Sequence, residues 1–138
     1  MFRTSTVLRS CAVSFLLIAA SCTPDTPPPP AKEAHANGLT ISYRLPTGTI
    51  PLNEPFPVII AVESAAGPLP ATAAVQVDAR MPAHNHGMPV RPEVVPIEPG
   101  LWRADPMLFQ MPGHWQLIVT VGTAPTTTQV AFDIHVRP

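Results

Sequence analysis

The chain has 138 residues, of which 46% are hydrophobic, 12% are charged and 20 are prolines, and its formal net charge is −1. Because proline is poorly tolerated inside helices, this composition argues against a mainly helical fold, and the length suggests a single domain. The near balance of acidic and basic side chains argues against a nucleic-acid-binding protein, which would need a basic face.

The chain opens with a positively charged and then apolar segment. Arg3 and Arg9 precede the run CAVSFLLIAA, which is too short to cross a bilayer and is typical of a secretory signal. The run ends in the letters AASC, which resemble the bacterial lipoprotein signal, in which the cysteine is lipidated. We therefore expect a signal peptide at residues 1–21 and lipidation of Cys22; ordinary signal cleavage that leaves a soluble protein is the alternative. Because Cys11 is the other cysteine, the rest of the chain has no thiol for a disulfide or for catalysis.

A proline-rich stretch follows the cysteine. Residues 23–38 read TPDTPPPPAKEAHANG, without a large apolar side chain to bury. Such a segment favours an extended, partly polyproline spacer. We expect residues 22–38 to be a lipidated cysteine and spacer, and residues 39–138 to be the folded domain.

Period-two alternation of apolar and polar residues dominates the predicted domain and indicates half-buried strands. The clearest runs cover residues 39–45, 56–62, 75–81, 115–121 and 130–136. Two weaker strands are expected near residues 91–97 and 101–109, at sheet edges because they contain prolines. Trp115 shares the core face of its run, whereas His135 alternates away from the core. The sequence predicts an all-β, immunoglobulin-like sandwich of about seven short antiparallel strands.

One histidine- and methionine-rich cluster is a candidate metal site. The segment MPAHNHGM holds two of the five histidines and two of the five methionines. The candidate ligands are His84, His86, Met88 and Met81, with Met111 and His114 from the later segment MLFQMPGHW. Thioether and imidazole together suit copper, especially Cu(I), and the cluster lacks the thiolates of a structural zinc site. If residues 84–88 are extended, His84, His86 and Met88 project to one side at ~7 Å intervals, although the nearby prolines favour a loop at the sandwich rim.

Each candidate also has a purely structural interpretation. Met81 has the parity of the core residues of its run, which favours packing over metal binding. Met111 can fill an irregular gap in the core. His84 and His86 can hydrogen-bond to the backbone and fix a turn, with Gly87 at a positive φ.

Three motifs occur in a characteristic order: MPAHNHGM, then G-x-W-x-A at residues 100–104, then M-x-G-x-W at residues 111–115. This arrangement resembles the YtkA-like family over about residues 39–136. The matching positions are Met81, Pro82, His84, His86, Met111, Gly113 and Trp115. The resemblance implies a β-sandwich, often anchored to membranes, without an established enzymatic activity, and relatives such as the FixH-like proteins are associated with copper handling. His114 falls at an unconstrained position of the third motif.

The leading hypothesis is a lipid-anchored β-sandwich at the periplasmic or outer side of a bacterial membrane that binds or passes copper. It would use His84, His86 and a methionine, with the membrane and a copper-receiving envelope protein as partners. The alternative is a structural or protein-interaction module of the cell envelope that binds no metal. An enzyme is not expected, because no serine–histidine–carboxylate set is evident and the histidine pair has no general-acid partner.

Overall fold

A computed structural model describes residues 32–45 and 50–138, which form ten β-strands and one 3-10 turn. The predicted signal peptide at residues 1–21 and the predicted lipidation site Cys22 lie outside the described residues. In the part of the chain that is described, no helix has the length and apolar character needed to cross a membrane. The elements are β1 (Lys32–Ala36), β2 (Leu39–Arg44), β3 (Phe56–Ser64), β4 (Gly67–Pro68), β5 (Ala74–Met81), the turn η1 (Pro82–His84), β6 (His86–Gly87), β7 (Glu93–Glu98), β8 (Leu101–Met107), β9 (Gly113–Thr123) and β10 (Thr126–Val136).

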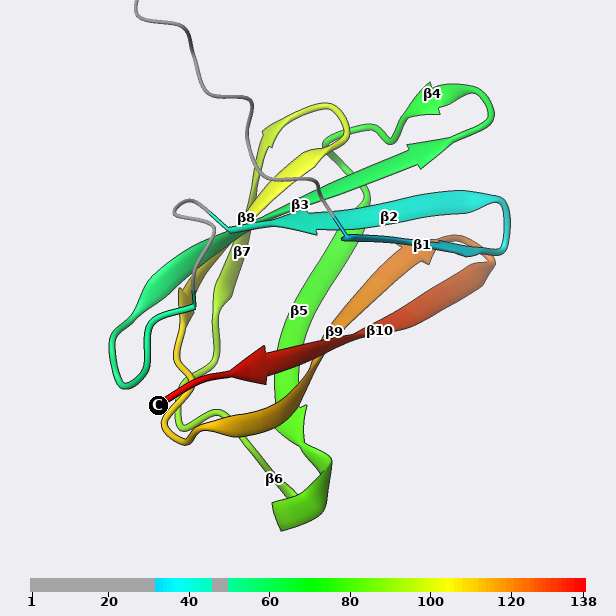
Figure 1. The fold of residues 1–138 in the computed structure, drawn as a ribbon. Helices are drawn as coiled ribbons and strands as arrows, with labels where there is room; N and C mark the ends of the chain where they lie inside the picture. Colours follow the sequence, from blue (N-terminus) through cyan, green and yellow to red (C-terminus); the bar gives the residue numbers. More distant parts are fainter. Residues whose placement is uncertain (1–31, 46–49) are drawn as a thin grey trace, which may run out of the picture.

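The strands form two antiparallel sheets that pack as a sandwich (Figure 1). The first sheet has the order β1-β2-β3-β8-β7, with β4 paired to β3, and the second has the order β10-β9-β5-β6. The pairings β3–β8 and β5–β9 join segments that are far apart in the sequence. The predicted all-β sandwich is therefore confirmed, with ten strands rather than about seven.

The core lies between the inner faces of the two sheets, and the alternation seen in the sequence defines those faces. In β9, Trp115, Leu117, Val119 and Val121 are all fully buried. From the first sheet, Trp102 of the G-x-W-x-A motif is 2% exposed and packs into the same core. His135 of β10 is exposed, as its parity predicts. The strand register predicted from period-two patterning is thus confirmed.

Strand β1 lies within the segment predicted to be a spacer, so the predicted domain boundary at residue 39 is too late. Its residues pair with β2 from Lys32↔Tyr43 to Ala36↔Leu39. Asn37 and Gly38 make the connection at φ values of 49° and 75°, as a two-residue hairpin with positive φ at both central positions requires. The Asn-Gly pair is a hairpin signal that outweighs the low hydrophobicity of the strand preceding it.

Strand β1 also touches the second sheet, and it thereby closes one side of the sandwich. The Lys32 ammonium donates a hydrogen bond to the Asp133 carbonyl oxygen of β10 at 3.0 Å. The Asn37 side-chain amide donates to the Thr128 hydroxyl oxygen at 3.1 Å. These contacts explain why a polar five-residue strand is held in place.

Of the two proline-containing strands, β7 is at a sheet edge as predicted, but β8 lies between β3 and β7. The prediction of an edge position is therefore wrong for β8. Pro106 falls where the β3–β8 ladder shifts register and beyond the last β7–β8 pair, Glu93↔Asp105. A proline at an interruption of the ladder costs little, because no regular hydrogen bond is lost there.

Candidate metal centre

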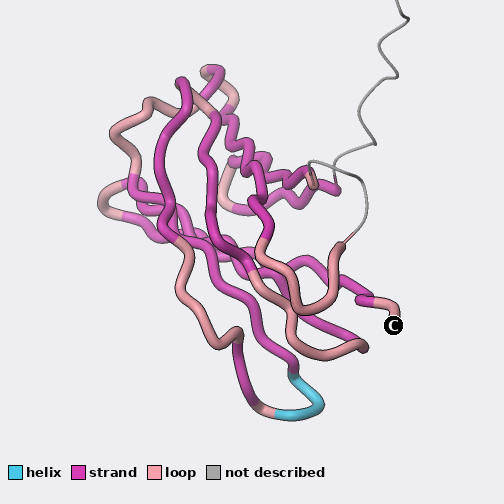
Figure 2. The backbone as a smooth tube through the Cα atoms, turned by 90° about the vertical axis from the view of Figure 1, so that its left-hand side faces the viewer, coloured by secondary structure: helices cyan, strands magenta, loops and turns pink. Residues whose placement is uncertain are grey.

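Three of the six predicted metal ligands, His84, His86 and Met88, lie in a loop at one end of the molecule, formed by residues 82–88 and called here the histidine loop (Figure 2). Pro82 begins the 3-10 turn, and Asn85 ends it in the left-handed conformation at φ 48° and ψ 41°. The chain then returns as β6, with His86 opposite Met81. The predicted rim loop is confirmed, and residues 84–88 do not form one extended run, because Pro82 starts a turn that ends at Asn85. Asn85, not Gly87, supplies the positive φ.

The turn brings the rings of His84 and His86 together. Their ring centroids lie 5.8 Å apart with an interplanar angle of 43°. Two imidazoles bound to one metal ion at ~2.0–2.1 Å would place their ring centres roughly 5–6 Å apart. His84 is exposed and His86 is half-buried, so the pair lies at the boundary between the core and solvent.

The half-buried histidine packs against the first core residue of β9. The ring centroid of His86 lies 5.6 Å from that of Trp115 in an edge-to-face arrangement. The Trp115 indole N–H donates a hydrogen bond to the Met111 carbonyl oxygen at 3.0 Å. The M-x-G-x-W segment therefore lies beside the histidine loop, which is the condition under which Met111 can join a site with the histidines.

The backbone beside His86 favours one tautomer of its ring. Its Nδ1 lies 3.1 Å from the Gly87 carbonyl oxygen. Because a carbonyl oxygen can only accept, this contact is a hydrogen bond in the tautomer that has its hydrogen on Nδ1, and the lone pair is then on Nε2. Histidines that bind metals commonly donate their other ring N–H to a backbone carbonyl in this way.

The three candidate methionines have different surroundings. Met81 is 3% exposed, and its terminal methyl lies 2.6 Å from the point where a Cβ on Gly113 would stand. The Met88 sulfur accepts a hydrogen bond from the Leu108 N–H at 3.4 Å. Met111 is half-buried, and among the described residues its sulfur has no hydrogen-bond donor. Met81 is thus a core residue, and Met111 has the sulfur least engaged by its neighbours.

The structure does not bring His114 together with the histidine loop. His114 neighbours Trp115 in β9 and so points to the opposite, outer face, where it stacks on His135 with ring centroids 5.1 Å apart. Its Nε2 lies 2.7 Å from the Asp133 carboxylate. This hydrogen bond, with a second from Gln116, lowers the pKa of the Asp133 carboxyl group below its ordinary value of 3.8. His114 belongs to a separate surface cluster.

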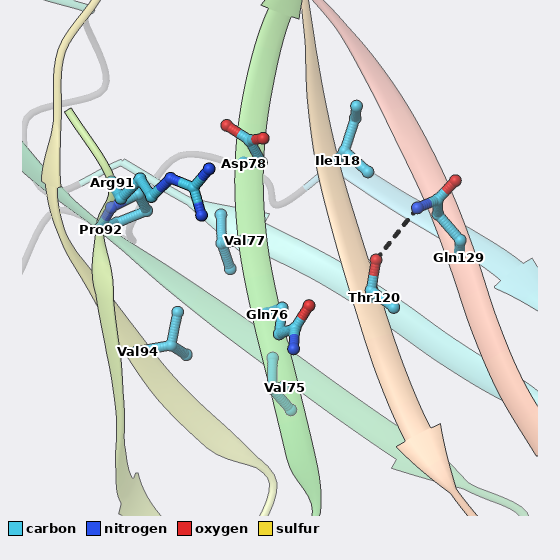
Figure 3. A pocket seen from close by; sticks show the side chains of 10 residues that line it. All are labelled: Val75, Gln76, Val77, Asp78, Arg91, Pro92, Val94, Ile118, Thr120 and Gln129. Atoms are coloured by element: carbon cyan, nitrogen blue, oxygen red, sulfur yellow. Dashed lines mark hydrogen bonds between the residues drawn. The ribbon is translucent and has the colours of Figure 1, made fainter. Parts of the chain in front are cut away.

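One hollow of the described structure is separate from the candidate ligands. It has a volume of about 550 Å³ and lies where β5 faces the segment leading into β7 (Figure 3). Its polar lining includes Asp78 and Arg91, and its apolar lining includes Val77 and Val94. No histidine or methionine lines it, so it offers nothing to a soft metal ion.

Within residues 32–45 and 50–138, no three side chains of His, Cys, Asp or Glu gather as ligands for a metal ion. A third ligand for a centre at His84 and His86 would therefore be a group of another kind, and the thioethers of the nearby methionines are the candidates. Sequence reasoning missed Gln110, whose side chain contacts both His86 and Gly87. Gln110 lies in a loop without periodicity, so no pattern in the sequence pointed to it.

The fold and the loop together define a two-sheet β-sandwich domain that carries a histidine pair beside methionines at one end. The model of the YtkA-like family matches residues 34–120, and the chain belongs to that family. Its fold is similar to the crystal structure of a DUF4426 family protein from Pseudomonas aeruginosa PAO1, with a TM-score of 0.51. The two chains share 14% sequence identity over 78% of this chain and 95% of the other, so this likeness concerns the fold alone. Among curated proteins, none matches this chain.

Proposed function

We propose that this protein binds Cu(I) in the histidine loop and passes it to a receiving protein of the cell envelope. The observation that carries the proposal is the pair of His84 and His86, with ring centroids 5.8 Å apart and with no hydrogen-bond partner for the His86 Nε2 among the described residues. Two imidazoles alone would hold a metal loosely. A soft third ligand completes the site, and Met111 is the first choice because its sulfur is the least engaged.

The chemistry of the donor set selects the metal. Thioether sulfur is soft and imidazole is borderline, a combination that favours Cu(I). A structural zinc site would need thiolates or more histidines, and calcium or magnesium would need several oxygen ligands. The described residues offer no such cluster around the histidine loop.

The position of the loop supports transfer rather than storage. His84 is exposed and His86 is half-buried at one end of the sandwich, so a partner protein can approach a metal held there. A ligand at the surface can leave the metal while a ligand of the partner takes its place. Under this proposal the protein acts by binding and delivery, without catalysing a reaction.

The location of the protein is part of the proposal. Residues 1–21 would direct export, and the lipidated Cys22 would anchor the domain on a bacterial membrane, facing the periplasm or the exterior. The proline-rich residues that follow Cys22 would separate the domain from the membrane surface.

Chelator-competition titration with Cu(I), under reducing conditions, tests the site. The variant carrying both His84→Ala and His86→Ala should lose specific Cu(I) binding while keeping the far-UV circular dichroism of the wild type. His114→Ala is the matched control: it removes a histidine from the outer face and should bind as the wild type does. Met111→Leu should weaken binding more than Met88→Leu, and either change should cost less than ~1.5 kcal/mol of stability because volume is kept.

If the wild-type domain fails to compete with a micromolar Cu(I) chelator, the histidines serve only to stabilise the turn and the proposal is wrong. The alternative function is then an interaction module of the envelope. The observation that favours it is the exposure of Val95 and Ile97 on β7, at 41% and 55%. A module of that kind should bind neither Cu(I) nor Ag(I).

A further inference from the structure

Gln110 reaches from the loop before β9 to the backbone of the histidine loop. Its side-chain Nε2 donates a hydrogen bond to the Gly87 carbonyl oxygen at 3.3 Å. The same oxygen lies 3.1 Å from the Nδ1 of His86. One carbonyl therefore accepts from two side chains, one from each of the two segments that form the candidate site.

The distances decide between two arrangements of hydrogens. Gln110 Nε2 also lies 3.5 Å from His86 Nδ1, and in the alternative arrangement Nδ1 accepts a hydrogen bond from this amide. That arrangement would direct the Nδ1 lone pair at the Gly87 carbonyl oxygen only 3.1 Å away, which is repulsive. The shorter contact favours Nδ1–H donating to Gly87, with Gln110 as the second donor to the same oxygen.

The amide oxygen of Gln110, Oε1, has no hydrogen-bond donor among the described residues. The atom is buried. A buried acceptor without a donor loses its hydration and gains nothing in return. An apolar side chain of similar length would avoid this loss, so stability alone does not account for a glutamine at this position.

We propose that Gln110 is a positioning residue that selects the Nδ1–H tautomer of His86. By holding the Gly87 carbonyl oxygen in place, it fixes the acceptor for Nδ1–H and leaves the Nε2 lone pair for a ligand. The link from this tautomer to copper rests on the proposed function; the tautomer itself does not. Without Gln110, the short strand β6 would hold Gly87 less firmly, and the ring would shift toward the Nε2–H tautomer that predominates in water.

Long-range proton–nitrogen NMR correlations of His86 in the copper-free, full-length protein test this selection directly. Wild type should show Nδ1 protonated and Nε2 unprotonated at neutral or slightly alkaline pH. Gln110→Met keeps the length of the side chain but removes donor and acceptor, and it should shift the population toward Nε2–H. Gln116→Met is the matched control, because Gln116 lies on the outer face and bonds to Arg80 and Asp133; it should leave the His86 signals unchanged.

Unfolding and metal affinity separate a positioning role from a structural one. Gln110→Met should unfold at the same or a higher denaturant concentration than wild type, since it removes the unpartnered acceptor, and yet bind Cu(I) about 10–100-fold more weakly. A lower unfolding midpoint with an unchanged tautomer overturns the proposal, as does a wild-type His86 that is already Nε2–H. If the tautomer shifts as expected but wild type binds no Cu(I), the positioning role stands and the proposed copper function falls.

Discussion

Trp115 links the stability of the domain to the geometry of the candidate site. Its ring is fully buried and packs against Phe109 with ring centroids 4.9 Å apart. It also contacts the ring of His86, and its indole N–H donates a hydrogen bond to the Met111 carbonyl oxygen. A single side chain thus supports the core, one histidine and the backbone of one candidate methionine.

We expect Trp115→Ala to destabilise the domain by ~3–5 kcal/mol, the usual cost of truncating a large buried aromatic residue. Since small domains have total stabilities of roughly 5–15 kcal/mol, this change is large enough to threaten folding. His135→Ala, on the outer face, should stay within about 0.5 kcal/mol. Chemical denaturation of both variants measures the difference, and equal losses would mean that the strand register is inverted.

At the level of single residues, the sequence predicted a loop that holds His84 and His86, but not the 3-10 turn within it. The histidines of MPAHNHGM do lie together, but a turn starting at Pro82 brings them together rather than an extended strand. The alternation that placed Trp115 in the core also implied that His114 faces outward, and this signal was available from parity alone. Gln110 could not be found, because its role depends on a contact between two loops that only the fold creates.

Strand β1 is the element that the alternation of the sequence failed to predict. Its side chains are mostly polar and exposed, yet it pairs with β2 and bonds to β10 through Lys32 and Asn37. Alternation predicts strands that bury one face, so it identified the core strands and missed this one. Its position depends on the Asn37–Gly38 turn and on hydrogen bonds rather than on apolar burial.

A domain that begins at Leu39 should therefore be less stable than one that begins at Ala31. The truncation removes the β1–β2 pairing and the hydrogen bonds of Lys32 and Asn37 to β10. Because each hydrogen bond contributes about 0.5–1.5 kcal/mol net, we expect the free energy of unfolding to fall by ~2–4 kcal/mol. The newly exposed edge of β2 should also promote association between copies. Urea denaturation and light scattering of the two proteins measure both effects.

Glu33→Ala is the control for this truncation. Glu33 lies on β1, and among the described residues its ion-pair contact is with the exposed His35 at 3.6 Å. Its removal should leave the unfolding midpoint nearly unchanged, because exposed pairs contribute little. Equal stability of the two truncation lengths would show that β1 contributes nothing to the fold.

For the whole molecule, the proposed location depends on one residue outside the described structure. Cys22→Ala should move the protein from the membrane fraction to the soluble fraction, because several acyl chains hold a protein firmly where a single chain would not. Cys11→Ala, within the predicted signal peptide, should leave the protein in the membrane fraction. If the Cys22→Ala protein resists a high-salt wash of the membranes, the anchor prediction is wrong.

The pairing of β5 with β9 has a consequence for the order in which the chain acquires its structure. The histidine loop belongs to a local hairpin between β5 and β6, which can form early because its two strands are close in sequence. Gln110, Met111 and Trp115 reach that hairpin only when β9 pairs with β5, and contacts between such distant segments form slowly. Newly synthesised chains would thus pass through a stage in which His84 and His86 are present without the residues that orient them. If the proposed function holds, metal loading should therefore follow the closure of the second sheet rather than guide it.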